Sequence, residues 1–271
     1  MKSLKQIGLF LLYTFSITWA SWLIIIICNT YFNTLLYSTP TFWIPYTLGS
    51  LGPFISAYLI YRQFKEYFKD KTFVKYIFGT KPTTKVWLIF GLFLAWRLFM
   101  IWISFGINKP ISISILSILI NLPFVLVLGG LEELGWRGIL QPKLEKSITY
   151  LPSVLVVGII WSFWHLPLWF MKESVQSGFP FWLYFLSGLV LTASFTTLYK
   201  YTNNLFLCML SHAWFNSCIG LALYVGNNGV LQLNLNWKVM VVFAFEFIVS
   251  VIFGIAYNRK NNTVAVKNYT A

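Results

Sequence analysis

Long apolar runs recur along the whole chain, each of about 20 residues, the length that an α-helix needs to cross a bilayer. Of the 271 residues, 58% are hydrophobic and only 10% are charged, whereas soluble domains carry about 25% charged residues. A water-soluble core of this size has no room for so much apolar side chain. The sequence therefore predicts an all-α, polytopic transmembrane bundle of about eight helices. The expected helices cover residues 7–28, 42–61, 86–107, 112–130, 151–170, 181–199, 204–225 and 239–257.

The distribution of Lys and Arg predicts how the chain is oriented. Residues 1–258 are expected to form one transmembrane domain, followed by a polar cytoplasmic tail at 259–271. If the N-terminus lies inside, sixteen of the 20 basic residues fall in inner segments and three in outer segments. Cytoplasmic loops carry the excess of Lys and Arg, so both termini are predicted to be cytoplasmic. We expect a multi-pass protein of the plasma membrane.

The net charge of +13 indicates an anionic partner. The basic residues lie between apolar runs, so the lipid headgroups of the anionic inner leaflet are the expected partner. No folded basic surface remains outside the membrane, and we therefore expect no nucleic-acid binding.

Ionisable residues inside apolar spans are costly, at about 2.5 kcal/mol or more each, and each one needs a reason. Glu132 and Glu133 precede Arg137, and Glu133 and Arg137 are spaced to pair on a helix. One carboxylate would be held ionised by the cation, and the other left free to act as a base. An ordinary charge cluster at a helix end is the alternative. Arg97 and Glu246 lie in two other spans and are expected to pair structurally.

Both histidines of the chain fall in predicted spans. His165 stands among aromatic residues, where a structural role is the alternative to a catalytic one. His212 and Asn216 share a helical face and are suited to donate hydrogen bonds to an oxyanion, or to join helices. Helical rise puts Glu132, His165 and His212 at similar depths, about 16–22 Å from the cytoplasmic ends of their helices. Gly129 and Gly130 allow a bend there, and the pocket would open to the cytoplasm.

Three motifs in order carry a family resemblance: Glu132-Glu133-x-x-x-Arg137, Trp161-x-x-x-His165 and His212-x-x-x-Asn216. They resemble the EExxxR, FxxxH and HxxxN motifs of the CAAX prenyl endopeptidase and bacteriocin-processing family (CPBP, or Abi). The resemblance covers about residues 120–220, where the family's catalytic core is expected. Trp161 stands where the family usually has Phe, which keeps an aromatic wall.

The resemblance implies an intramembrane endopeptidase acting on a membrane-associated peptide or a lipidated protein, as CAAX-type prenyl proteases do. Glu132 would activate a water that His165 holds, His212 and Asn216 would stabilise the oxyanion, and Glu133 and Arg137 would support Glu132. The family is often described as metalloproteases, and the zinc ligands here would be Glu132, His165 and His212. A metal-free mechanism driven by the glutamate is favoured over zinc, because HExxH is absent and the zinc ligands would be spread over three helices.

Other functions remain open from the sequence. A non-catalytic bacteriocin-immunity or regulatory membrane protein would retain the same fold. A proton-coupled transporter would use the same intramembrane Glu and His residues as a proton path. An aspartyl protease is excluded, since it needs two aspartates and the chain has one.

Overall fold

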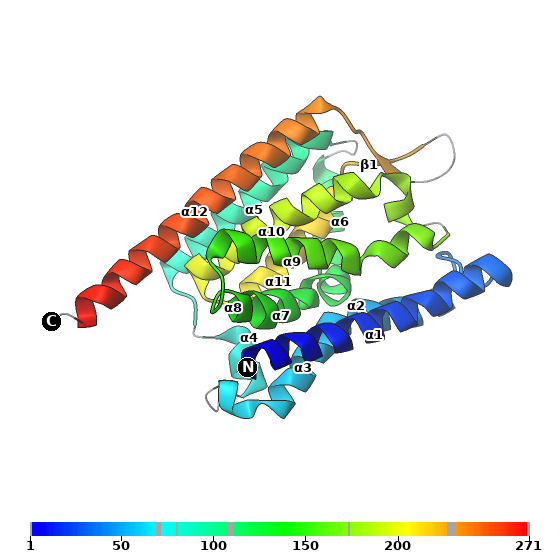
Figure 1. Ribbon diagram of the computed structural model, residues 1–271. Coiled ribbons are helices and arrows are strands. Elements are labelled where there is room, and N and C mark those ends of the chain that lie inside the picture. Colours follow the sequence, from blue (N-terminus) through cyan, green and yellow to red (C-terminus); the bar gives the residue numbers. More distant parts are fainter. Residues whose placement is uncertain are drawn as a thin grey trace.

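The computed structural model describes residues 2–68, 72–79, 81–107, 111–172, 174–226 and 231–269, and this part of the chain is almost entirely helical (Figure 1). By length and composition, six helices within it can cross a membrane. They are Ser3–Tyr31, Thr84–Phe105, Ile115–Leu144, Tyr150–Phe170, Phe181–Thr202 and Trp237–Lys260. The predicted all-α integral membrane bundle is therefore confirmed, while the count of eight spans is not.

The long helices are named here with their bounds. They are α1 (Lys2–Tyr31), α5 (Thr84–Phe105), α6 (Ile111–Leu128), α9 (Tyr150–Trp164), α10 (Phe181–Thr202), α11 (Leu205–Ile219) and α12 (Trp237–Tyr269). The short helices are η2 (Lys65–Phe68), α4 (Phe73–Phe78), η5 (Leu166–Phe170) and η6 (Val175–Gly178). A two-stranded antiparallel sheet joins β1 (Leu223–Val225) to β2 (Leu231–Leu233).

Two of the expected spans are not among these six, because one is a broken helix and the other a shortened one. The run 42–61 forms η1 (Pro40–Phe42), α2 (Trp43–Ser50) and α3 (Gly52–Gln63), with a break at Leu51. The run 204–225 forms α11, which has 15 residues, and then leaves the helix for the small sheet.

The break between α2 and α3 is held by helix α1. Thr18 donates its hydroxyl hydrogen to the carbonyl of Gly49 at 2.7 Å, and Trp22 donates its indole N–H to the carbonyl of Tyr46 at 3.2 Å. Backbone groups freed by a helix break in an apolar medium need such partners. Gly49 lies so close to the Trp22 ring that a Cβ there would be 2.2 Å from the indole nitrogen.

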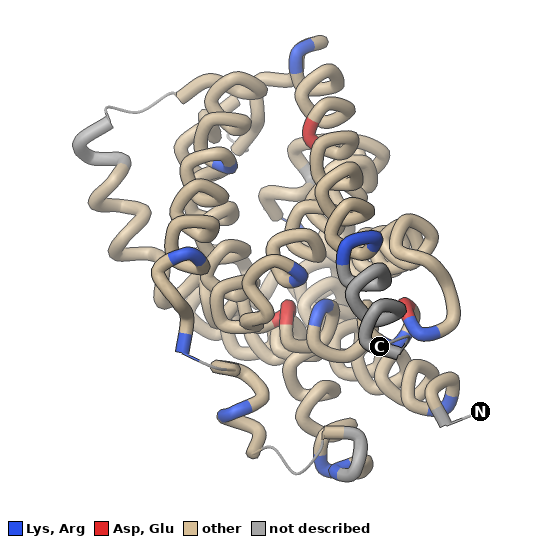
Figure 2. The backbone as a smooth tube through the Cα atoms, turned by 90° about the vertical axis from the view of Figure 1, so that its left-hand side faces the viewer, with Lys and Arg blue, Asp and Glu red and all other residues tan. Residues whose placement is uncertain are grey.

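The bundle has two outer layers and a centre. Helix α1 packs on α2 and α3, and α12 packs on α5 and α10 at the opposite side (Figure 1). Helices α9, α10 and α11 lie between them, and the centre buries the large side chains Trp22, Trp136 and Trp164. In Figure 2 most Lys and Arg positions lie toward the end of the bundle that carries both labelled termini.

The predicted bend at Gly129 and Gly130 is present, and it divides the fourth expected helix into several turns. After α6, the backbone leaves the helical region at Gly129 (φ −140°, ψ −48°). It continues as η3 (Gly130–Glu132), α7 (Glu133–Gly135), the π-helix η4 (Trp136–Leu140) and α8 (Gln141–Leu144). Single-turn π-helices widen the backbone spiral and occur frequently at functional sites.

The bent segment is fixed by close packing at glycine positions. A Cβ at Gly130 would lie 2.6 Å from the carbonyl oxygen of Met209, so η3 rests directly on the backbone of α11. A Cβ at Gly135 would lie 2.8 Å from both Phe10 and Pro53, which belong to α1 and α3. The absence of side chains at these glycines lets three helices meet at the bend.

We predict that Gly135→Ala destabilises the fold, because the added methyl overlaps Phe10 and the Pro53 backbone. Overpacking of this kind costs about 1–3 kcal/mol. Thermal unfolding of the purified protein in detergent measures the effect as a lower Tm. Gly91→Ala is the control, since a Cβ at Gly91 has no atom within 4 Å. Equal Tm values for the two variants would contradict this account of the bend.

Candidate active site

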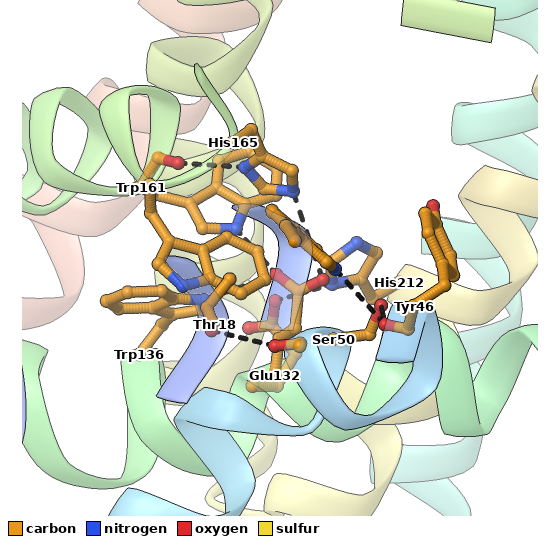
Figure 3. Close-up of polar contacts among 12 residues, drawn as sticks. Thr18, Tyr46, Ser50, Glu132, Trp136, Trp161, His165 and His212 are labelled. Atoms are coloured by element: carbon orange, nitrogen blue, oxygen red, sulfur yellow. Dashed lines mark hydrogen bonds and ion pairs between the residues drawn. The ribbon is translucent and has the colours of Figure 1, made fainter. Parts of the chain in front are cut away.

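Glu132 lies at the end of the η3 turn, buried in the centre of the bundle. Its carboxylate oxygen Oε2 accepts hydrogen bonds from two indoles, Trp161 Nε1 at 2.7 Å and Trp136 Nε1 at 3.3 Å. The other oxygen, Oε1, lies 3.9 Å from His165 Nε2. Figure 3 shows the two tryptophans and His165 grouped around this carboxylate. The two neutral donors fix the carboxylate without a contact to a cation.

His165 caps the C-terminal end of α9, where the chain turns into η5 through Pro167. Its Nδ1 lies 2.8 Å from the carbonyl oxygen of Trp161. A carbonyl oxygen only accepts, so Nδ1 carries the hydrogen and neutral His165 has an acceptor lone pair on Nε2. The rings of Trp161, Trp164 and Tyr184 pack edge-on against the imidazole. The position, tautomer and orientation of His165 are thereby fixed.

Glu133 joins the α7 turn to α11 through a second polar cluster. Its side chain is fully buried and pairs with Arg137 Nη1 at 3.1–3.2 Å, as the spacing in the sequence predicted. Oε1 of the same carboxylate accepts a hydrogen bond from His212 Nδ1 at 2.8 Å. The guanidinium of Arg137 also lies over the ring of Phe195, and that ring stacks on His212. Glu133 therefore holds His212 in place, while Arg137 balances the buried charge.

Asn216 lies one helical turn after His212 on α11, and both side chains come close to Gly129. A Cβ at Gly129 would be 2.5 Å from Asn216 Nδ2 and 3.6 Å from His212 Nε2. The two nitrogens therefore converge on one point of the bent backbone. This point lies three residues before Glu132 in the chain.

One cavity of about 360 Å³ brings these groups together: Glu132, His165, His212 and Asn216 all line it. Its remaining wall is mostly apolar and aromatic, which is typical of a ligand site with a few placed polar groups. Within the described part of the chain, Glu133 and Arg137 are not lining residues. They pair with each other, and Glu133 also contacts His212, which does line the cavity.

The predicted zinc ligands Glu132, His165 and His212 line one cavity, with Nε2 of His165 3.9 Å from Oε1 of Glu132. Within the residue ranges that the structure covers, no group of three His, Cys, Asp or Glu side chains is close enough to hold a metal ion. The use of zinc by these residues stays a prediction from the sequence.

Two polar contacts of this site were missed by reasoning from the sequence. The motif comparison assigns no role to Trp136, which lies between Glu132 and Arg137, and treats Trp161 only as an aromatic wall in place of the usual Phe. Both are hydrogen-bond donors to Glu132. The spacing of Trp136, four residues after Glu132, was the available signal, because residues at i and i+4 share a helical face.

The fold and these contacts define a polytopic helical membrane protein with a buried carboxylate, two histidines and an asparagine around one cavity. Residues 113–218 match the family described as type II CAAX prenyl endopeptidase Rce1-like. This region contains all six predicted site residues. The chain is also similar to CAAX prenyl protease 2 of Methanococcus maripaludis, with 29% identity over 138 residues. That match covers 47% of this chain and 51% of the relative, so it spans about half the length of each. The predicted resemblance to the CPBP proteases is confirmed for this region.

Proposed function

We propose that this chain is an intramembrane endopeptidase that hydrolyses a peptide bond in a membrane-associated peptide or a lipidated protein of the CAAX type. One observation carries the proposal: Glu132, His165, His212 and Asn216, from three separate helical segments, line a single buried cavity. The matches to CAAX prenyl endopeptidases support the same chemistry. A base, a held water and oxyanion donors in a dry site are the groups that amide hydrolysis needs.

The geometry suits a water held between Glu132 and His165. Oε1 of Glu132 and Nε2 of His165 are 3.9 Å apart, and a water at about 2.8 Å from each can hydrogen-bond to both. Both atoms are acceptors, so this water donates both of its hydrogens and presents a lone pair to the cavity. Glu132 then takes the proton as the water oxygen attacks the peptide carbonyl.

His212 and Asn216 are proposed to stabilise the oxyanion formed by that attack. The Asn216 amide is a donor in any state. The Nδ1 hydrogen of His212 is directed at Glu133, so His212 can donate through Nε2 only as an imidazolium. The carboxylate of Glu133, 2.8 Å from Nδ1, would be the ion-pair partner of that imidazolium. Glu133 and Arg137 are thus proposed as positioning residues that act through His212.

The orientation and partners are proposed from the sequence pattern. With both termini cytoplasmic, the cavity would open toward the cytoplasm, and the basic inner segments would contact anionic lipid headgroups of the plasma membrane. The clustering of Lys and Arg at one end of the bundle supports this orientation (Figure 2). Three of the basic residues counted for it, Lys69, Lys71 and Lys109, lie outside the described residues.

Glu132→Gln is predicted to reduce hydrolysis by at least about 100-fold, since the amide cannot take a proton from water. The measurement is cleavage of an internally quenched farnesyl-cysteine peptide by the purified protein in detergent. Glu145→Gln is the matched control, because Glu145 is paired with Lys200 away from the cavity. Cleavage by Glu132→Gln at the rate of the control would exclude Glu132 as the base. No cleavage by the unsubstituted protein would favour the immunity or transporter functions.

Trp161→Phe is predicted to lower kcat about tenfold, the value of one hydrogen bond to a charged group, while the aromatic wall remains. Trp164→Phe is the matched control, because the buried Trp164 Nε1 has no hydrogen-bond partner in the described structure. The same peptide assay measures both variants. An equal loss of kcat in both would mean that ring packing, and not the bond to Glu132, is responsible.

Gly129→Ala is predicted to lower kcat about 100-fold, the typical loss when an oxyanion donor is removed. The added methyl would displace the Asn216 amide. Gly91→Ala, in open space on α5, is expected to keep full activity. Circular dichroism and Tm establish that both variants are folded. Full activity of Gly129→Ala would place the oxyanion site elsewhere.

A further inference from the structure

A second charged group lines the same cavity and has no part in the mechanism above. Arg97 of α5 and Glu246 of α12 form a buried ion pair, as the sequence predicted, with 3% of each side chain exposed. Both residues line the cavity that holds Glu132. A buried ion pair contributes little to stability on average, since desolvation offsets the attraction. Stability alone therefore does not explain a charged pair at this place.

Arg97 retains hydrogen-bonding capacity beyond its pair. A guanidinium has five N–H donors in a planar fork. The pair with Glu246 is made through Nη1, and the buried Nε has no hydrogen-bond partner in the described structure. Of the described residues that line the cavity, Arg97 is the one Lys or Arg. Arg97 thus places a cation on the wall of the space in which a peptide would lie, and its guanidinium has donors beyond the one paired with Glu246.

Arg97 contacts α11 beside the proposed oxyanion donors. The guanidinium carbon lies 4.8 Å from the ring centroid of Phe215. Phe215 directly precedes Asn216 and lies one turn after His212. An extended peptide advances about 3.3 Å per residue, so a carbonyl at Asn216 and a carboxylate at Arg97 are separated by only a few residues.

We propose that Arg97 is a binding residue for a carboxylate of the substrate peptide, located a few residues from the scissile bond. The inference rests on the proposed function and names a substrate feature that the site selects. A planar carboxylate matches the guanidinium fork and makes charge-assisted hydrogen bonds with it. Glu246 keeps the cation oriented while the cavity is empty. The carboxylate is the peptide C-terminus or an acidic side chain, which share this chemistry.

Binding to the Glu132→Gln protein tests the subsite separately from cleavage. The probes are three fluorescent farnesyl-cysteine peptides, and their anisotropy is measured in detergent. One peptide has a free C-terminal carboxylate, one a C-terminal amide, and one a C-terminal amide with Glu as its last residue. We expect at least one of the two peptides that carry a carboxylate to bind about tenfold more tightly than the neutral amide peptide. The comparison of the two carboxylate peptides identifies the source of the carboxylate.

The decisive variant is Arg97→Gln combined with Glu246→Gln, which removes both charges and leaves no unpaired buried ion. Its carboxylate-to-amide binding ratio is expected to fall to about one. The matched control combines Lys200→Gln with Glu145→Gln, which removes the ion pair outside the cavity and should keep the tenfold ratio. The proposal is overturned if all three peptides bind equally to the Glu132→Gln protein. It is also overturned if the tenfold carboxylate-to-amide ratio is retained when Arg97 and Glu246 are both replaced by Gln.

Failure of the subsite and failure of the proposed function are distinguishable. If the unsubstituted protein cleaves acid and amide peptides equally well, the protease function stands and the Arg97 subsite is wrong. If no peptide is cleaved but the carboxylate preference depends on Arg97, the subsite stands and the protease function is wrong.

Discussion

Two adjacent carboxylates in the centre of an apolar bundle are the constraint on which the rest of this structure depends. Glu132 and Glu133 are both buried, so each must find polar partners within the protein. The partners come from different directions: indoles for Glu132, and a guanidinium and an imidazole for Glu133. The segment that carries both residues must therefore contact α9 on one side and α11 on the other.

The backbone of residues 129–140 satisfies this demand by departing from the α-helix. A straight helix would direct Glu132 and Glu133 about 100° apart at a fixed register. The chain departs from the α-helix at Gly129, in the 3₁₀ turn η3 and in the π-helix η4. These departures change the directions of side chains before and after the two carboxylates. Close contact of Gly130 with α11 and of Gly135 with α1 and α3 then holds the irregular segment in place. The glycines thus act on the site through packing.

Much of this arrangement could be predicted from the sequence, because its signals are local. The pairing of Glu133 with Arg137 follows from helical spacing, and the bend follows from two consecutive glycines. The pairing of Arg97 with Glu246 follows from the cost of unpaired charge in a span. The lengths of the second and seventh helices could not be predicted in this way. Hydropathy measures how apolar a run is, whereas the carbonyls of Tyr46 and Gly49 beside the break find their partners, Trp22 and Thr18, on another helix.

The contacts that distinguish the two carboxylates are long-range, and they were the least predictable part of the site. His212 is 79 residues from Glu133, and Trp161 is 29 residues from Glu132. No pattern within one helix specifies such contacts, although the sequence did predict that one carboxylate would be held by the cation and the other left freer. The carboxylate of Glu133 pairs with two basic partners, Arg137 and His212. The carboxylate of Glu132 accepts hydrogen bonds from two neutral indoles through one oxygen. Its other oxygen is left toward the cavity, and no Lys or Arg among the described residues pairs with it. This asymmetry supports the proposal that Glu132, and not Glu133, takes the proton from water.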